Sequence, residues 1–294
     1  MILLDSMMQL YRANYKLSDL VTRKGQPTGM EYGFLKSLEA LRRFFKDEII
    51  LCWEGRNNFR YKIDSEYKAN RREKRRKEAH TFMTFERINN FKKLLSMVAE
   101  NAVDDELEAD DIMASLAKKY AETENVIIYS GDKDMFQVLQ DKPFKIHQCR
   151  EFQHRKKLWT PARIEEKFYG LTTKQLTTFF AFIGDAVDNI KGVGKVRKPL
   201  IGAAINRGYK PNEIWNYELF SLREANALEE YYNSGKFRQN LELITLKIKD
   251  NIPIVQRNWQ PDEVGRWLND MEIRTLKLCR ECGLEATIRE DEEF

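Results

Sequence analysis

Nine carboxylates in this 294-residue sequence fall where a metal-binding site could form. Three expected strands run almost directly into an acid: Asp5 follows one, Glu54 follows the next, and Asp132 follows a third after a Ser-Gly turn. Ligands of open α/β sheets bind outside the carboxyl ends of the strands, so we expect these acids to meet at one edge. The candidate metal ligands are Asp5, Glu54, Glu108, Asp110, Asp111, Asp132, Asp134, Asp185 and Asp188.

A cluster of negative charge at one sheet edge is unfavourable unless cations neutralise it. Ligands that offer only carboxylate oxygens favour Mg²⁺, with Mn²⁺ as a substitute, over zinc. Two such ions can activate a water molecule and stabilise the leaving oxygen when a phosphodiester is hydrolysed. Since no Ser/His/Asp or Cys/His set suggests a protein nucleophile, the pattern predicts metal-assisted hydrolysis.

Most of these acids also have an ordinary structural explanation. A single acid could be a favourable charge at a helix N-terminus, a turn residue or a helix cap, and this applies to Asp110, Asp111, Asp132, Asp134, Asp185 and Asp188. Asp5 is harder to explain in this way because it directly follows an apolar strand. The joint pattern is much less expected by chance than any one of its members.

Residues 68–77 form a basic run. They carry seven basic side chains and one acidic one, a local charge of 7 − 1 = +6, whereas the whole chain carries +4. Most charge runs are solvated helix faces, but this concentration predicts contacts with phosphates. Tyr67, Phe82 and Phe85 flank the run and could stack on unpaired bases. For Phe82 and Phe85, ordinary packing is the expected fate.

The order of the expected elements predicts an α/β fold with a mostly parallel central sheet flanked by helices. The apolar strands alternate with segments that carry apolar residues at helical spacing, such as residues 32–45 and 109–120. From about residue 181, strands give way to helices and a Gly-rich turn. We expect an α/β domain over residues 1–180, a helical subdomain over 181–255, and a C-terminal segment of unassigned role over 256–294.

Composition argues against several other classes of protein. No apolar run approaches the roughly 20 residues that a membrane helix needs, and the start of the chain lacks the basic region of a secretory signal. We therefore expect an intracellular protein with no membrane partner. Four cysteines are too few for a disulfide scaffold. The spacing of Cys279 and Cys282 would suit zinc only with two further ligands, and two reduced cysteines on a helix are the simpler interpretation.

Several segments, in order, resemble the flap endonuclease and 5′–3′ exonuclease family of phages, bacterial DNA polymerase I and eukaryotes. The resemblance runs from Met1 to about Asp250. It is carried by ILLDSMMQLYRA near the start, PTGMEYGFLKSL after it, EYKANR at 66–71, LEADD at 107–111, SGDKDMFQVL at 130–139 and IGDAVDNIKGVGK at 183–195. Each motif alone is moderately specific, and the ordered set is strong.

The resemblance implies a PIN-like nuclease domain with a helical arch around residues 68–91 and a helix-turn-hairpin subdomain that binds duplex DNA. One metal would lie among Asp5, Glu54, Glu108 and Asp110, with Asp111 close by. A second would lie among Asp132, Asp134, Asp185 and Asp188. Lys68 and Arg71 would be catalytic, at the foot of the arch, and would contact the scissile phosphate.

The resemblance also implies where DNA binds. Gly192 and Gly194 would present backbone N–H groups to a duplex phosphate, with a K⁺ ion as a candidate bridge. The further candidate DNA-binding residues are Tyr67, Arg72, Lys74, Arg75, Arg76, Lys77 and Lys195. Two features depart from the family pattern: Glu54 stands where Asp is usual, and residues 189–195 are about three residues shorter than the usual hairpin. The longer Glu54 leaves two alternatives, a shifted metal or an intervening water.

The implied activity is hydrolysis near the 5′ ends of branched DNA or RNA/DNA, giving 5′-phosphate and 3′-hydroxyl ends, in removal of primers and flaps during replication. We expect a monomer, encoded by a phage and acting in the bacterial cytoplasm, with a single-strand DNA-binding protein or a sliding clamp as candidate partners. One alternative is an inactive relative that binds branched DNA, which the full carboxylate set argues against. Another is a toxin-like ribonuclease, but those small domains lack the arch and the Gly-rich hairpin.

Overall fold

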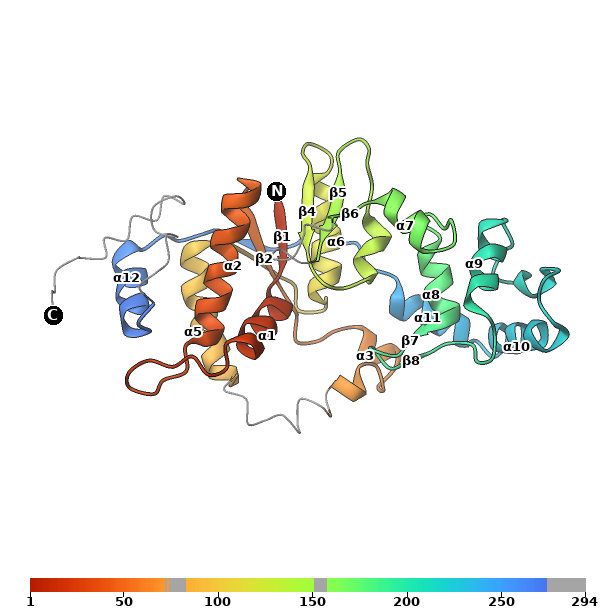
Figure 1. Cartoon of the computed structure of the whole chain (residues 1–294), viewed down its shortest axis with the longest axis horizontal. Helices are drawn as coiled ribbons and strands as arrows, with labels where there is room; N and C mark the ends of the chain where they lie inside the picture. Colours follow the sequence, from red (N-terminus) through yellow and green to blue (C-terminus); the bar gives the residue numbers. More distant parts are fainter. Residues whose placement is uncertain (72, 74–82, 151–157, 274–294) are drawn as a thin grey trace.

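The computed structural model describes the chain except for residues 72, 74–82, 151–157 and 274–294. Within the described residues the strands of the central sheet lie in the order β6-β5-β4-β1-β2-β3-β9 (Figure 1). The inner five pair in parallel, and the edge strands β6 and β9 pair antiparallel. The bounds are β1 (Ile2–Asp5), β2 (Ile49–Trp53), β3 (Glu100–Val103), β4 (Val126–Tyr129), β5 (Ile146–Cys149), β6 (Leu158–Trp159) and β9 (Ile254–Val255). The predicted α/β fold with a mostly parallel sheet is confirmed.

The apolar runs become strands because both faces of the sheet are covered. All residues of β2 are buried, as are the first three of β1, which is why these strands show no polar alternation. The sequence pattern missed β3 and β5 because each carries a polar residue that is buried and satisfied by its neighbours. Asn101 accepts a hydrogen bond of 2.7 Å from the Trp53 indole, and Gln148 donates one of 2.9 Å to the Ser130 carbonyl.

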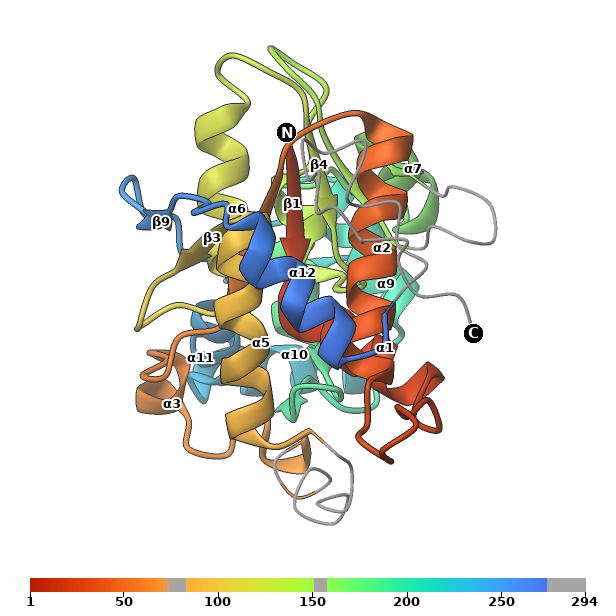
Figure 2. The same cartoon turned by 90° about the vertical axis from the view of Figure 1, so that its left-hand side faces the viewer.

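Two layers of helices sandwich the sheet (Figures 1 and 2). One apolar cluster joins Ile2 and Leu4 of β1 to α1 (Ser6–Lys16), α2 (Gly29–Phe45), α5 (Phe85–Val98) and α12 (Pro261–Asp270). The other cluster contains Leu3 of the same strand and α6 (Ala109–Tyr120) on the opposite face. Alternate residues of β1 thus belong to different cores, as the two-residue side-chain period of a strand requires.

The second core continues without a break into a helical region at one end of the molecule (Figure 1). Its elements are α3 (Arg60–Ile63), η1 (Asp134–Val138), α7 (Pro161–Lys167), α8 (Leu176–Ile183), β7 (Gly184–Asp185), β8 (Ile190–Lys191), α9 (Lys198–Asn206), η2 (Ile214–Asn216), α10 (Leu222–Asn233) and α11 (Lys236–Ile244). Strands β7 and β8 pair antiparallel and form a hairpin between α8 and α9. The predicted domain boundaries at residues 180 and 255 stay a prediction.

The C-terminal segment returns to the α/β layer. Strand β9 pairs with β3, and the Trp267 ring of α12 stacks on Phe91 of α5 with centroids 5.7 Å apart. The Thr28 hydroxyl adds a hydrogen bond of 3.1 Å to the Met271 carbonyl. Residues 261–273 therefore cover α2 and α5, whereas Cys279 and Cys282, with the zinc alternative, lie outside the described residues. No helix in the described part of the chain is long and apolar enough to cross a membrane.

Candidate functional site

The carboxyl ends of β4, β1 and β2 meet at one pocket, as the sequence predicted for open sheets. The helix start at the LEADD motif and the β7–β8 hairpin complete its walls. Six of the nine candidate metal ligands line this pocket: Asp5, Glu54, Glu108, Asp110, Asp132 and Asp185. Lys68 and Arg71, the predicted catalytic residues, line it too. Residues far apart in the sequence are thus brought together at one site.

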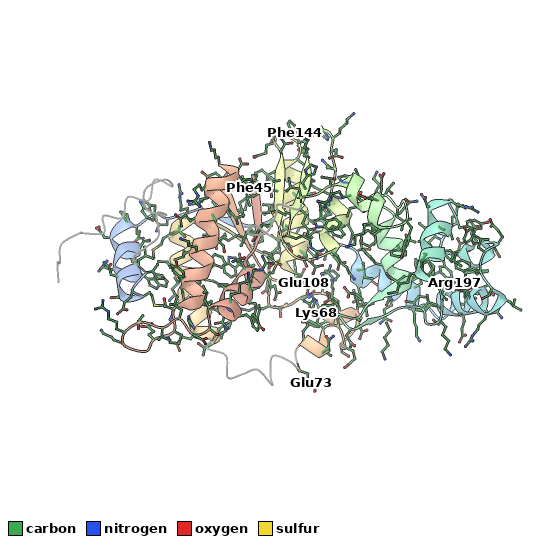
Figure 3. The ribbon with its side chains drawn as sticks, in the orientation of Figure 1. Phe45, Lys68, Glu73, Glu108, Phe144 and Arg197 are labelled. Carbon is green, nitrogen blue, oxygen red and sulfur yellow. The ribbon has the colours of Figure 1, made fainter. Side chains whose placement is uncertain are left out.

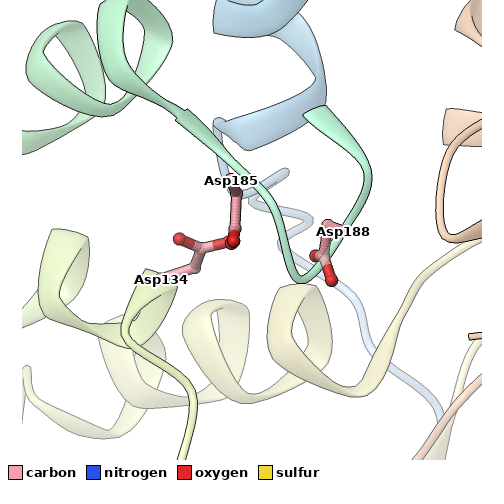
Figure 4. A group of neighbouring side chains, drawn as sticks. All are labelled: Asp134, Asp185 and Asp188. Atoms are coloured by element: carbon pink, nitrogen blue, oxygen red, sulfur yellow. The ribbon is translucent and has the colours of Figure 1, made fainter. Parts of the chain in front are cut away.

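Asp134 and Asp188 lie beside the pocket rather than in its lining. One carboxylate oxygen from each of Asp134, Asp185 and Asp188 lies within 4.8 Å of the other two. Figure 4 shows the side chains of Asp134 and Asp185 pointing toward each other, from η1 and β7, with Asp188 beside them on the turn of the hairpin. Such spacing lets three carboxylates share one cation, and these are three members of the second predicted metal site.

Asp111 requires a correction, because the structure turns it away from the pocket. Both of its oxygens accept hydrogen bonds from the Arg60 guanidinium, at 2.6 and 2.8 Å. The same carboxylate also accepts from the backbone N–H groups of Glu108 and Lys247. With its acceptor positions filled and the side chain fully buried, Asp111 is a structural anchor at the start of α6 and not a metal ligand.

The pocket carboxylates hold more negative charge than the protein compensates. The pKa of Asp5 is raised from 3.8 to about 7, mainly by burial and in addition by the nearby Glu54 and Asp132, against a hydrogen bond from the Met8 N–H that lowers it. Burial likewise raises the pKa of Asp110 well above its usual value, with Asp132 and Asp5 adding to the effect. Among the described residues, Oδ1 of Asp110 is buried without a hydrogen-bond partner.

These features fit a divalent cation bound through oxygen. A buried carboxylate oxygen without a donor is costly, and a bound cation would satisfy it. The donor set consists of carboxylates, which suits Mg²⁺ or Mn²⁺ better than zinc. Burial also raises the pKa of Asp134 well above its usual value, with the charge of Asp132 adding to it. Each of the two predicted metal sites therefore contains a carboxyl group with a raised pKa.

Lys68 and Arg71 neutralise one side of the cluster. The Lys68 ammonium lies 2.6 Å from Oε1 of Glu108 (Figure 3) and 3.8 Å from Asp188, and the Arg71 guanidinium pairs with Asp188. Burial alone would raise the pKa of Glu108, but Lys68 and Arg60 lower it below its usual value. The left-handed backbone of Lys68 (φ 54°) is held by its N–H, which donates to the Asp188 carbonyl at 2.9 Å. Strained backbone of this kind concentrates at functional sites.

The flanking aromatics differ from expectation. Tyr67 is only 3% exposed, and its hydroxyl donates to Glu108 at 3.0 Å and Asp188 at 3.3 Å, so it cannot stack on DNA bases as predicted. Phe85 was expected to pack internally, yet it is 68% exposed with the Arg56 guanidinium 5.7 Å from its ring centroid. Phe82 and the basic residues Arg72, Lys74, Arg75, Arg76 and Lys77 lie outside the described residues.

The Gly-rich segment belongs to the β7–β8 hairpin and the turn after it. A Cβ on Gly192 would lie 2.2 Å from the carbonyl carbon of Ile183, so close approach of the backbone after β8 to the end of α8 explains this glycine. Gly194 has open space around its Cα, and Lys195 adopts a left-handed conformation (φ 63°). Binding of duplex DNA or K⁺ by these residues stays a prediction.

Comparison with known proteins identifies the family. The model of the 5′-3′ exonuclease N-terminal resolvase-like domain matches residues 1–169. The chain belongs to this 5′-3′ exonuclease family. The 5′-3′ exonuclease of Buchnera aphidicola subsp. Schizaphis graminum is 31% identical over 264 residues, covering 88% of this chain and 81% of the relative. Thermostable DNA polymerase I of Thermus aquaticus is 34% identical over 197 residues, covering 65% of this chain and 22% of the relative.

A solved structure shares the fold. The bacteriophage T5 flap endonuclease, in a complex with DNA and metal ions, superposes with a TM-score of 0.66 at 18% identity and covers 83% of this chain and 88% of its own. The resemblance to the flap endonuclease and 5′–3′ exonuclease family is therefore confirmed. The sequence relatives are bacterial and the structural relative is from a phage, so phage origin stays a prediction.

Three basic residues of this 5′-3′ exonuclease family member were missed from the sequence. Arg60 is nearly completely buried and fixes Asp111. Lys133, between two of the predicted ligands, lies 3.1 Å from Asp185, and Arg150 also lines the pocket. The position of Lys133 inside the SGDKD motif was a usable signal. Arg60 and Arg150 reach the site only through tertiary packing, and the sequence carries no local sign of it.

Proposed function

We propose that this chain is a divalent-metal-dependent 5′ nuclease, acting as a flap endonuclease, a 5′–3′ exonuclease or both. One observation carries the proposal: acids at the ends of three neighbouring parallel strands share one pocket with Asp110, Lys68 and Arg71, and the described residues compensate the negative charge around Asp5 and Asp110 only in part. Family membership supports the reaction class, and the pocket supplies the groups that the reaction needs.

The proposed metal ligands are Asp5, Glu54, Glu108 and Asp110 for one Mg²⁺, and Asp132, Asp134, Asp185 and Asp188 for another, with Mn²⁺ as a substitute. When bound, such ions would lower the pKa of a water molecule and neutralise charge on the phosphate and the leaving oxygen. The side chain of Asp5 is fixed for this task because its Oδ1 accepts the Met8 N–H at 2.9 Å and so caps α1.

Lys68 and Arg71 are proposed to bind the scissile phosphate. Each carries a positive charge at the pocket wall and is held by carboxylates of the cluster. A phosphate entering the pocket would accept hydrogen bonds from these cations, and they would stabilise the charge that develops during cleavage. Because both follow Tyr67, whose hydroxyl is anchored on Glu108 and Asp188, their backbone is positioned before substrate binds.

The helical region around the β7–β8 hairpin is proposed to hold duplex DNA next to the pocket, with K⁺ as a candidate ligand. Asp185 and Asp188 lie on the hairpin itself, so a duplex bound there would enter the pocket from that side. Gly194→Ala should fold normally because its Cβ would meet nothing within 4 Å, and should weaken duplex binding if its N–H contacts a phosphate. Unchanged binding in both KCl and NaCl would remove Gly194 and K⁺ from the proposal.

In the cell, the proposed role is removal of primers and flaps during DNA replication or repair. The proposed substrates are 5′-ended strands of branched DNA and RNA/DNA, with a single-strand DNA-binding protein or a sliding clamp as proposed partners. Shape and charge of the pocket suit any phosphodiester, so the 5′-end preference must come from the residues around it.

The test is cleavage of a 5′-flap duplex labelled separately at each strand end, in Mg²⁺ and in EDTA. We expect Mg²⁺-dependent release of 5′ fragments, as mononucleotides if exonuclease action dominates or as longer pieces if the flap is cut at its base. Tight binding without cleavage in Mg²⁺ or Mn²⁺ would instead support an inactive DNA-binding relative. Cleavage of unstructured RNA without a 5′-end preference would support a ribonuclease.

A further inference from the structure

Glu54 lines the pocket, and two residues after it Arg56 meets an exposed aromatic ring, that of Phe85. Phe85 is the first residue of α5, and the Arg56 guanidinium lies 5.7 Å from its ring centroid. Phe85 is 68% exposed, so burial does not account for its presence there. An exposed ring paired with a guanidinium matches the chemistry that binds unpaired nucleotides, because a base can stack on the ring while the cation meets its phosphate.

Lys92, two turns further along α5, adds a second cation. Its ammonium lies 4.2 Å from the centroid of the Trp53 ring and is partly buried. Glu54 attracts this charge and Arg56 repels it, but no carboxylate of the described residues lies within ion-pair distance of it. A partly desolvated ammonium without a close anion is unfavourable by itself, and a phosphate would supply the missing partner.

The start of α5 does not need Phe85 to keep its shape. The Thr84 hydroxyl caps the helix by accepting the Arg87 N–H at 3.2 Å, and the Arg87 side chain holds Glu31 of α2 through a hydrogen bond of 2.6 Å. Removal of the Phe85 ring should therefore leave the fold intact. A structural role for the ring is a weaker explanation than contact with a ligand.

The position of this surface suits one path of the DNA strand across the protein. The β7–β8 hairpin and the start of α5 lie to either side of the carboxyl end of β1 in Figure 1, and Asp185 of the hairpin and Glu54 both line the pocket. A DNA strand that is base-paired near the hairpin would pass over the carboxylates and exit the pocket beside Glu54. Only an unpaired base can stack there, because a paired base already stacks on its neighbours.

We propose that Phe85, Arg56 and Lys92 form a binding subsite for one unpaired nucleotide of the cleaved strand, with its base stacked on Phe85 and its phosphate between the two cations. The subsite is tolerant of base identity because every base has a π face. It rests on the proposed 5′ nuclease function, since it names the part of the substrate that lies next to the scissile phosphate.

The first experiment measures stacking without cleavage. A 5′-flap duplex carries 2-aminopurine at one flap position at a time, and its fluorescence is measured on binding to the full chain in Ca²⁺. We expect strong quenching at one position next to the junction, lost in Phe85→Ala and retained in Phe44→Ala. Phe44 is a matched control because it lies at the end of α2 that leads into the amino end of β2, whereas the pocket lies at the carboxyl ends of the strands. Equal quenching in wild type and Phe85→Ala would overturn the subsite.

The second experiment measures the phosphate contact. Lys92→Met should weaken binding of the flap duplex about 10-fold at low salt and lower the slope of log affinity against log salt by about 0.7, the value for one phosphate of a single strand. Lys93→Met is the control because it removes an exposed lysine next in the chain. Identical salt slopes for the two variants would contradict the role of Lys92.

The two proposals can fail separately. If wild-type protein quenches 2-aminopurine through Phe85 but cleaves no flap in Mg²⁺, the subsite stands and the nuclease function is wrong. If flaps are cleaved and Phe85→Ala cleaves them at the wild-type rate, the nuclease function stands and the subsite is wrong. If the subsite contributes to cleavage, Phe85→Ala should cleave the flap about 10-fold more slowly than wild type. Replacing the nucleotide at the quenched position by an abasic residue should not slow cleavage by Phe85→Ala any further, because the stacking contact is already lost.

Discussion

Arg60 and Asp111 form a buried two-bond ion pair directly behind the pocket, with N–O distances of 2.6 and 2.8 Å. The guanidinium also donates to the carbonyls of Leu243 and Thr245. The pair thereby joins the segment after β2, the start of α6 and the end of α11. The position of Glu108 and Asp110, the proposed metal ligands at the start of α6, depends on this ion pair.

Asp111→Asn should destabilise the fold strongly, because it leaves the buried Arg60 charge with only the more distant Glu108 carboxylate, at 3.4 Å. Loss of one member of a buried pair typically costs about 3–5 kcal/mol. The measurement is urea denaturation in EDTA, with Asp110→Asn as the matched neighbour. The Asp110 variant should lose little or gain stability, since it removes an uncompensated charge. Equal destabilisation by both variants would contradict the distinct roles given to these two acids.

Metal-free protein should lose stability as pH rises through the titration of Asp5. The folded state raises the pKa of Asp5 from 3.8 to about 7, so between these values the folded state binds more protons than the unfolded state. The free energy of unfolding must then fall as pH increases across that window. Asp5→Asn should flatten this dependence while keeping the helix cap, and Mg²⁺ should restore stability at about pH 8 by binding the folded state. Parallel pH profiles for wild type and Asp5→Asn would argue against the effect.

Lys68→Met should slow cleavage far more than it weakens DNA binding. The ammonium is a donor aimed at the pocket, and loss of one such donor typically costs about 10²–10³-fold in rate. Single-turnover cleavage and equilibrium binding separate the two effects. Lys62→Met, which removes an exposed lysine of α3, is the control and should match wild type. A rate for Lys68→Met within a few-fold of the control would exclude Lys68 from the reaction.

Glu54→Gln should raise the Mg²⁺ concentration that gives half-maximal cleavage by about 10–100-fold, the range typical for groups that support a metal. Saturating Mg²⁺ should recover most of the rate, because the other carboxylates remain. A Mg²⁺ titration of cleavage measures this, with the exposed Glu106→Gln as control. If the two variants titrate alike, Glu54 plays no part in metal binding.

The sequence predicted the sheet and the meeting of its acids because strand ends and parallel topology fix where Asp5, Glu54 and Asp132 must lie. It could not separate Asp110 from Asp111. Successive helical residues differ by about 100° in direction, and only the tertiary position of Arg60 decides which acid faces the pocket.

The exposure of two aromatic residues was predicted wrongly for a similar reason. Tyr67 was expected on the surface and is buried, whereas Phe85 was expected in the core and is exposed. Both flank the same basic run, and whether each is buried depends on residues distant in sequence. Glu108 and Asp188, for example, hold the Tyr67 hydroxyl. Local pattern carries no information on such contacts.

The most direct test of the account compares binding and single-turnover cleavage of a 5′-flap duplex by Asp132→Asn and by Asp250→Asn, an exposed control. Asp132 lies in the pocket and raises the pKa of both Asp5 and Asp110, so it is central to the proposed metal cluster. We predict that Asp132→Asn binds the flap as tightly as the control and does not cleave it in Mg²⁺. Cleavage by Asp132→Asn at the rate of the control would show that the carboxylate pocket is not the catalytic centre.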